Sequence, residues 1–262
     1  MLQCEVENGV RRNPLYLPIA RTGFLLTYKT LTGNAIQEKF TLNETKKNLL
    51  TKPSSDFLVK LNSIRAEKLN PKFAELIDFI ERHIISGHVS ISDLPLQDIM
   101  YVPDGAEDFI PMYISSAVVT EITPLLLLFL KYENISALLF EEPEISLYPK
   151  LQWEIARVLI QLANMDIPVF VTTHSDIILQ HINNMIKAFD RKENSSFLEN
   201  LKYKEKELLS KDRVAVYQFD VQKNEKTQVN RLLCGDYGFE AMTFYNTLKQ
   251  LNDEIYQIES EE

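Results

Sequence analysis

The chain has 262 residues, of which 45% are apolar and 25% are charged, and its formal net charge is -9. This composition is that of a globular protein with a sizeable core, and it excludes a low-complexity or disordered chain. An acidic chain is poorly suited to a large non-specific nucleic-acid surface, so we expect nucleic acid to be reached only through partners. The longest apolar run, Leu125 to Leu130, is far shorter than the roughly 20 residues that span a bilayer, and we expect a cytoplasmic protein without a membrane segment.

Residues 1–32 predict a core strand followed by a helix. The strand is expected over Leu15–Ala20, interrupted by Pro18, which favours an edge position or a bulge. The helix is expected to follow Arg21 and to run through Leu31. Arg21 could reach a phosphate or a carboxylate, or it could be an ordinary solvated or salt-bridged residue, and the sequence leaves both alternatives open.

Residues 33–110 are expected to form a mostly helical insertion. Their first part, 33–56, is polar and predicts a loop or a peripheral segment. Apolar residues then recur three and four apart over 57–64 and 73–84, which predicts two amphipathic helices separated at Asn70-Pro71. A small antiparallel meander is predicted after them, with strands at 89–92, 99–102 and 109–113.

Residues 111–262 are expected to form the main α/β lobe, which begins with an almost wholly apolar helix. Ser115 or Ser116 is suited to cap its N-terminus, and Pro124 inside it predicts a kink or a break. The free backbone N–H groups at this helix start could also face a phosphate. The sequence alone leaves the plain cap and the phosphate site as alternatives.

A strand–helix–strand–helix pattern follows that helix. Strands are predicted over Ile135–Phe140 and Ile167–Val171, with a helix from Pro149 between them and another after Ser175. Such an order gives a right-handed βαβ unit with parallel strands. The predicted fold is therefore α/β, a partly parallel sheet flanked by helices, with a helical insertion.

The remainder of the chain offers less chemistry. Residues 187–212 are charged and predict an exposed helical or disordered excursion. A strand pair near the sheet edge is expected over 214–219 and 228–233, and a final amphipathic helix over 239–258.

Three carboxylates and a histidine fall at the carboxyl ends of the two parallel strands, where open α/β sheets bind their ligands. Because neighbouring side chains on a strand alternate faces, Glu141 and Glu142 are suited to different tasks. One could hold hydrated Mg²⁺ while the other polarises a water that attacks a phosphate. His174 could stabilise the transferring phosphoryl group or orient that water. Glu144 could cap the next helix or contact a partner subunit. The alternative for the Glu141–Glu142 pair is a solvated or helix-capping role, and the alternative for His174 is a histidine at the sheet edge with a backbone partner.

These residues resemble a known family. Leu-Leu-Phe-Glu-Glu-Pro-Glu-Ile-Ser-Leu-Tyr-Pro at 138–149, followed by Val-Phe-Val-Thr-Thr-His-Ser-Asp at 169–176, is similar to the Walker B, D-loop and switch-histidine segments of ABC-type ATPases of the AAA-like branch shared with OLD-family and SMC-related proteins. The resemblance covers about positions 14 to 190. It implies ATP and Mg²⁺ as cofactors.

The resemblance also implies a role for each matching residue. Glu141 would be the magnesium-associated Walker B acid, Glu142 the catalytic glutamate and His174 the switch histidine. Glu144 opens the D-loop region. Ser115 and Ser116 occupy the place of the signature motif, which in such dimers contacts the nucleotide of the opposite subunit, although the usual glycines are missing.

The chain departs from that family in one respect. It has 7 glycines, and none lies in the spacing Gly-x-x-x-x-Gly-Lys-Ser/Thr of a phosphate-binding P-loop. By resemblance the chain is the C-terminal portion of such an ATPase, and alone it should not bind ATP tightly. A separate polypeptide could carry the P-loop lobe, the gene could be truncated, or the scaffold could persist without catalysis.

Several functions follow from these alternatives. We expect an ATPase subunit or fragment that acts as a homodimer or with a partner carrying the P-loop lobe, with a role in phage defence or DNA maintenance by analogy. The alternative is a catalytically silent scaffold or regulatory subunit of the same fold. A magnesium-dependent nuclease that uses the three glutamates is disfavoured by the acidic composition.

Overall fold

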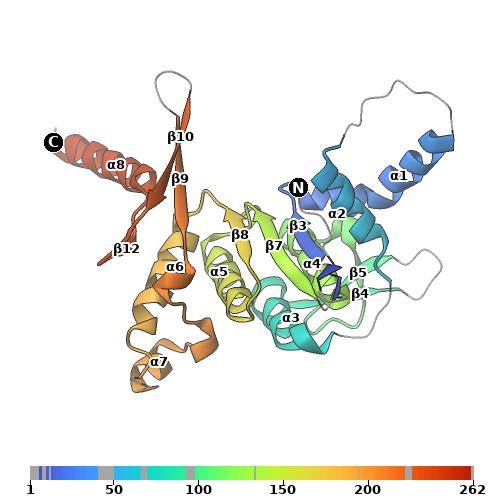
Figure 1. The fold of residues 1–262 in the computed structure, drawn as a ribbon, viewed down its shortest axis with the longest axis horizontal. Helices are drawn as coiled ribbons and strands as arrows, with labels where there is room; N and C mark the ends of the chain where they lie inside the picture. Colours follow the sequence, from blue (N-terminus) through green and yellow to red (C-terminus); the bar gives the residue numbers. More distant parts are fainter. Residues whose placement is uncertain are drawn as a thin grey trace. The chain divides into compact units, whose positions relative to one another are not determined.

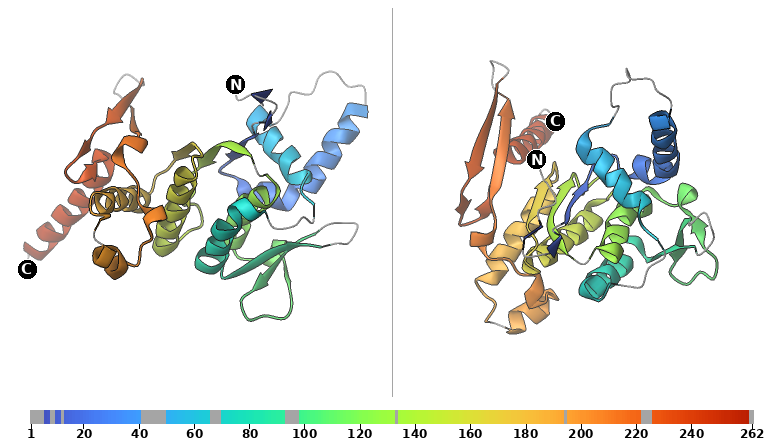
Figure 2. Two further views of the ribbon diagram at one scale, coloured as in Figure 1. Left: turned by 60° about the horizontal axis from the view of Figure 1, so that its bottom comes forward. Right: turned by 45° about the vertical axis from the view of Figure 1, so that its right-hand side comes forward.

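The computed structural model describes residues 6–7, 10–11, 13–40, 50–65, 70–92, 98–132, 134–193, 195–221 and 226–260. The chain forms two compact units, Met1–His174 and Ser175–Glu262 (Figures 1 and 2). In the described part of the chain, none of the helices combines the length and apolar character that crossing a membrane requires. The division into segments 1–32, 33–110 and 111–262 stays a prediction.

The first unit is built on a three-stranded parallel sheet. Its strands are β3 (Asn13–Leu17), β7 (Ile135–Glu141) and β8 (Val169–Thr172), in the order β3-β7-β8 (Figure 1). This sheet and its flanking helices confirm the predicted α/β fold. Strand β3 ends before Pro18, at the predicted interruption, and does not resume to Ala20 as predicted, because a proline has no N–H to continue a strand ladder.

Helix α4 (Ala117–Lys131) forms much of the core beside this sheet. Its residues from Val119 to Phe129 are all buried, as its apolar sequence predicts. The helix runs through Pro124 as one element, so the structure contains no break at that residue. The packing of fully buried side chains on both sides of Pro124 compensates for the one backbone hydrogen bond that the proline removes.

Two further helices pack beside β3 and α4, and they correct the loop predicted over 33–56. Helix α1 (Arg21–Phe40) extends eight residues past position 32, and α2 (Lys52–Asn62) begins within the predicted loop. Thr51 caps α2, because its hydroxyl accepts a hydrogen bond from the backbone N of Ser54. The rest of the predicted loop, residues 41–49, lies outside the described residues.

The other elements of the first unit agree with the predicted helices and meander. Strands β4, β5 and β6 pair antiparallel in that order. The bounds are β1 Val6–Glu7, β2 Val10–Arg11, η1 Pro71–Phe73, α3 Ala74–Ile80, η2 Glu81–Ile85, β4 Gly87–Ile91, β5 Ile99–Pro103, β6 Ile110–Pro111, η3 Met112–Ile114 and α5 Pro149–Asn164.

The second unit contains helices around short antiparallel ribbons. Strands β9 and β10 form a two-stranded sheet of their own rather than an extension of the parallel sheet, within the residues described. The segment 187–212 was predicted as an exposed helical or disordered excursion. It contains a helix at Ser195–Leu201, which agrees with the first alternative, but the side chains of Leu198, Leu208 and Leu209 are buried rather than exposed. The bounds are α6 Asp176–Phe189, α7 Ser195–Leu201, η4 Glu205–Glu207, η5 Lys211–Arg213, β9 Val216–Val221, β10 Thr227–Leu232, β11 Cys234–Gly235, β12 Gly238–Phe239 and α8 Met242–Ser260.

A side-chain amide joins α6 to β12. The Asn183 Nδ2 atom donates to the Phe239 carbonyl at 2.9 Å, and the Phe239 N–H donates to Asn183 Oδ1 at 2.8 Å. Asn183 therefore pairs with Phe239 as a neighbouring strand would. Because Phe239 belongs to β12, the last helix begins at Met242 rather than at the predicted position 239.

Candidate functional site

The carboxyl edge of the parallel sheet brings together the end of β7 and the end of β8. The apolar residues of β7 are mostly buried up to Phe140, and the first carboxylate, Glu141, is the last residue of the strand. The next residue, Glu142, has φ = 41°, in the left-handed region that residues other than glycine seldom adopt. Its N–H donates to the Thr172 carbonyl at 2.9 Å, which ties this strained residue to β8.

The carboxylate of Glu141 faces β3. Its Oε2 atom accepts a hydrogen bond from the Ile19 N–H at 3.3 Å, and the carboxylate also interacts with the Tyr16 hydroxyl. Burial, followed by the hydrogen bond and negative charge of Glu141, raises the pKa of Tyr16 to about 12. Tyr16 therefore stays a neutral hydrogen-bond partner at ordinary pH.

The carboxylate of Glu142 faces β8 instead. His174 Nε2 lies 3.7 Å from Glu142 Oε1, close enough for an ion pair when the imidazole is protonated. The His174 side chain is 84% exposed and that of Glu142 is 27% exposed. Both groups are therefore accessible to a ligand from outside this chain, and the two adjacent glutamates serve different neighbours as predicted from their alternation.

Glu144 contacts the backbone of His174. Its Oε1 atom accepts a hydrogen bond from the backbone N–H of His174 at 2.5 Å, which fixes the start of the segment after β8. Its Oε2 atom is buried and has no hydrogen-bond partner among the described residues. The structure thus brings Glu141, Glu142 and His174 to one edge, as the βαβ pattern predicted, and the hydrogen bond to His174 places Glu144 beside them.

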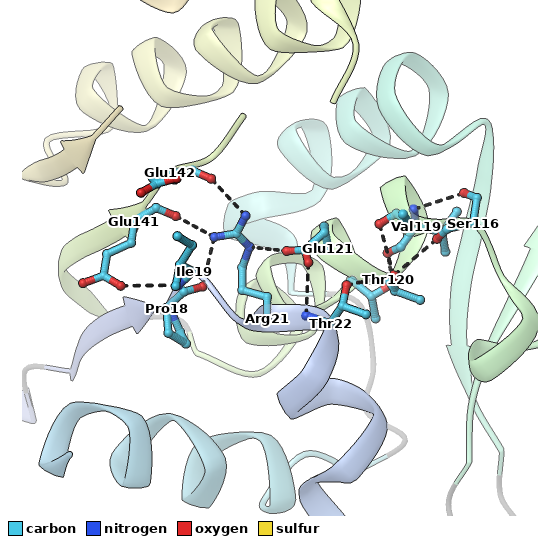
Figure 3. A network of polar contacts seen from close by, with 12 residues as sticks. Pro18, Ile19, Arg21, Thr22, Ser116, Val119, Thr120, Glu121, Glu141 and Glu142 are labelled. Carbon is cyan, nitrogen blue, oxygen red and sulfur yellow. Dashed lines mark hydrogen bonds and ion pairs between the residues drawn. The ribbon is translucent and has the colours of Figure 1, made fainter. Parts of the chain in front are cut away.

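A buried arginine donates hydrogen bonds to the backbone of this edge (Figure 3). The Arg21 side chain, at the start of α1, is fully buried and donates to the carbonyls of Pro18 at 3.0 Å, Glu141 at 2.6 Å and Glu142 at 3.1 Å. Its Nε atom lies 3.0 Å from Glu121 Oε2 on α4, as an ion pair rather than an aligned hydrogen bond. Burial lowers the pKa of Arg21, and the charge of Glu121 opposes that shift.

These contacts decide between the two alternatives for Arg21. The guanidinium also lies over the Phe140 ring, 4.8 Å from its centroid. With its donors directed at backbone carbonyls and at Glu121, Arg21 is a structural residue that positions the backbone of Glu141 and Glu142. A phosphate contact from this buried side chain is not part of the observed arrangement.

Ser115 and Ser116 lie apart from the carboxylates, at the start of α4. The Ser115 hydroxyl donates to the Pro111 carbonyl at 3.1 Å, and the Ser116 hydroxyl accepts from the Val119 N–H at 3.4 Å, so Ser116 is the helix cap. Figure 3 shows Ser116 and Glu142 at opposite ends of the polar network that runs through Glu121. Within one chain the two serines do not join the Glu142–His174 cluster.

The sequence did carry a signal for the missed residue Glu121. It is a lone carboxylate in the middle of a helix whose other residues are almost all apolar. A buried carboxylate needs a positive partner or hydrogen-bond donors, and Glu121 has both, because its Oε1 also accepts from the Thr22 N–H at 3.3 Å. The pattern indicates that a partner exists; it does not indicate which of the chain's basic residues it is.

The donor set is compatible with one magnesium ion bound together with a nucleotide. In the described part of the chain, no group of three or more His, Cys, Asp or Glu side chains converges as a metal site. Mg²⁺ bound to phosphates commonly uses only one or two protein carboxylates and keeps several waters. The Glu141 carboxylate, at the open end of β7, could be such a ligand.

Comparison with protein families agrees with an ATPase fold. A family model described as "AAA ATPase domain" matches residues 27–179, more than half of the chain, and this range contains the carboxylate edge and α4. The chain therefore belongs to the AAA ATPase domain family. Membership implies nucleotide binding, usually with Mg²⁺.

Other comparisons add little. Among solved structures, one described as "Structural biochemistry of ATP-driven dimerization and DNA stimulated activation of SMC ATPases" is 13% identical, with a TM-score of 0.40, over 69% of this chain and 95% of that chain. No curated protein matches the chain.

Proposed function

We propose that this chain supplies the hydrolytic side of an ATP site, in the manner of ABC-type ATPases of the OLD- and SMC-related branch. The observation that carries the proposal is the pairing of Glu142 and His174, 3.7 Å apart and both accessible, at the carboxyl edge of a parallel sheet. Ligands bind at this edge in open α/β folds. A carboxylate beside an imidazole is suited to hydrolysis of a phosphoanhydride.

Each residue has its own task in this proposal. Glu142 accepts a hydrogen bond from the attacking water and polarises it, while His174 donates to the terminal phosphate or orients the same water. Glu141, as the Walker B acid, would hold Mg²⁺, and the bound ion would neutralise charge on the phosphates. Arg21 holds the backbone carbonyls of Glu141 and Glu142, so the two carboxylates keep their divergent directions.

The phosphate-holding side must come from a P-loop lobe, because these 262 residues contain no P-loop spacing. One face of the sheet supports this part of the proposal. Tyr16, Leu139 and Phe170 lie in one cross-strand row, with Tyr16 and Leu139 partly exposed and Phe170 61% exposed. Parallel sheets are almost always covered on both faces, so an α/β lobe packed over this row would complete both the sheet and the nucleotide site.

The same proposal gives roles to the remaining predicted residues. Ser115 and Ser116 would contact the nucleotide held by an opposing subunit, which is consistent with their distance from Glu142 within one chain. Glu144, with one carboxylate oxygen buried and unpartnered among the described residues, would receive a donor from the opposing subunit. By resemblance alone, we propose that the assembly acts in phage defence or DNA maintenance.

The test is ATP hydrolysis by the complete assembly, purified through a tag on this chain. Glu142→Gln is expected to lower kcat by about 10²- to 10⁴-fold, because the water loses its base, while ATP-dependent association is retained. Glu107→Gln, which removes a carboxylate from an exposed turn, is the control and should retain full activity. Hydrolysis at the wild-type rate by Glu142→Gln would refute the assignment.

The missing P-loop spacing also favours a second candidate, a catalytically silent scaffold of the same fold. That function predicts an assembly that forms without ATP hydrolysis even with wild-type Glu142 and His174. Hydrogen exchange separates the two candidates. Protection of the segments around Glu142 and His174 on adding ATP and Mg²⁺ to the assembly supports the hydrolytic site, and unchanged exchange supports the scaffold.

A further inference from the structure

The first residues of α1 are joined to the second turn of α4 by polar contacts (Figure 3). The hydroxyls of Thr22 and Thr120 lie 2.9 Å apart. Glu121 accepts a hydrogen bond from the Thr22 N–H at 3.3 Å and forms the ion pair with Arg21. Arg21, Thr120 and Glu121 are all buried, so the two helices cannot separate here without leaving buried polar groups unpartnered.

The α4 side of this joint leads to Ser116. The Thr120 hydroxyl lies 3.3 Å from the Ser116 carbonyl and 3.1 Å from the Ala117 carbonyl, and it donates its single proton to them. Thr22 is therefore the donor in the contact between the two hydroxyls. Ser116 is exposed, and because its hydroxyl accepts from the Val119 N–H, its own proton can be donated outward. A phosphate attracted to this helix start would act directly on the turn that Thr120 holds.

The α1 side of the joint leads to Glu142. Arg21 donates to the carbonyls of Glu141 and Glu142 at 2.6 Å and 3.1 Å. The backbone of Glu142, with φ = 41°, keeps a conformation that only surrounding contacts can maintain in a residue other than glycine. A small shift of Arg21 would therefore change the direction of the Glu142 carboxylate relative to His174.

We propose that the hydroxyl contact between Thr22 and Thr120 makes the position of the Glu142 carboxylate depend on what binds at Ser116. The inference rests on the proposed function, in which Ser116 faces the nucleotide of the opposing subunit while Glu142 acts on the nucleotide beside its own sheet. A phosphate at Ser116 draws in the first turn of α4, the hydroxyl contact carries this shift to α1, and Arg21 passes it to the Glu142 backbone. Thr22 and Thr120 are thus positioning residues through which binding at one site controls hydrolysis at the other.

Hydrogen exchange of the full chain without nucleotide tests the link by itself. Thr120→Val keeps the shape of the side chain but removes its hydroxyl, and it is expected to speed exchange of the Glu142 N–H, which is bonded to β8, by about threefold or more. The matched control is Thr123→Val, because Thr123 is also buried on α4 and its hydroxyl bonds to a carbonyl of α4 and to the Met112 sulfur instead of to α1. Equal exchange of the Glu142 N–H in the two variants overturns the proposal.

ATP hydrolysis by the complete assembly tests the consequence. Thr120→Val is expected to lower kcat about fivefold and to leave KM unchanged, because it alters the position of Glu142 and not the binding of ATP. Thr120→Ser, which keeps the hydroxyl, should restore kcat, and Thr123→Val should match the wild type. A Thr120→Val assembly with the kcat of Thr123→Val overturns the proposal.

A double-variant cycle traces the link to Ser116. Ser116→Ala should lower kcat in the wild type but should lower it no further in Thr120→Val, because the route is already cut; two losses that multiply would overturn the link. Failure of the proposed function is a separate result. Hydrolysis at the wild-type rate by Glu142→Gln overturns that function and the catalytic role of the link with it, whereas the exchange experiment still decides whether the hydroxyl contact holds the Glu142 backbone.

Discussion

Replacing Arg21 with methionine should destabilise the first unit strongly. The substitution keeps a similar apolar length but removes the positive charge beside Glu121, whose side chain is only 7% exposed, and the donors to three backbone carbonyls. Removing one member of a buried ion pair costs about 3–5 kcal/mol, because the other charge stays buried without compensation. We expect a loss of about that size.

Urea unfolding followed by tryptophan fluorescence measures this loss. Trp153 is the chain's one tryptophan and lies on α5, so it reports on the first unit. The control is Arg82→Met, which breaks the exposed pair between Arg82 and Asp78 and should cost less than about 1 kcal/mol. The double variant Arg21→Met/Glu121→Met should be more stable than Arg21→Met, since it leaves no charge unpaired. A loss below about 1 kcal/mol for Arg21→Met, or no recovery in the double variant, would refute the reasoning.

Two other substitutions probe the sheet edge and the second unit. The phenol of Tyr16, measured as the ultraviolet titration difference between wild type and Tyr16→Phe, should ionise near pH 12. Because this folded-state pKa is raised, the stability that the protonated phenol contributes is complete below about pH 10 and is lost as the pH rises to 12. Glu141→Gln should lower the pKa of Tyr16, while burial keeps it above 10, and an unchanged pKa in Glu141→Gln would contradict the contact between the two side chains. Gly238→Ala should destabilise the second unit by more than about 1 kcal/mol, because φ at Gly238 is 98° and a Cβ there would lie 2.3 Å from the Asn183 side chain. The control is Gly235→Ala, whose Cβ would make an ordinary contact at 3.9 Å. Hydrogen exchange of the second unit measures the difference, and equal exchange in the two variants would argue against this packing.

The local pattern of apolar and turn residues was sufficient for most elements of the main sheet. The run 135–140, the proline at 149 and the following strand and helix occur where periodicity predicted them, because these segments form their structure from neighbouring residues. The same reasoning correctly brought Glu141, Glu142 and His174 to one edge. Because β7 and β8 are parallel, their carboxyl ends lie at the same edge of the sheet, and so do the residues that follow them.

Local pattern failed where polar residues form regular structure. The residues from Gly33 to Phe40 were predicted as a loop, since apolar periodicity fades there, yet Gln37, Glu38 and Lys39 are good helix formers and α1 continues through them. Over 187–212 the prediction allowed a helix, which is present, but it missed the burial of side chains. Two of the segment's buried leucines, Leu208 and Leu209, are adjacent and the third, Leu198, lies ten positions earlier, so they form no periodic stripe, and their burial depends on the fold of the second unit.

The sequence by itself determined the strand–helix order of the main sheet and the meeting of Glu141, Glu142 and His174 at one edge, because these follow from short-range spacing. Only the tertiary structure decided the role of Arg21. Its partner Glu121 is 100 positions away, and a buried charge chooses its counter-ion by proximity in space, which no local pattern encodes. That contact turns a residue that could have bound a phosphate into the one that holds the backbone of Glu141 and Glu142.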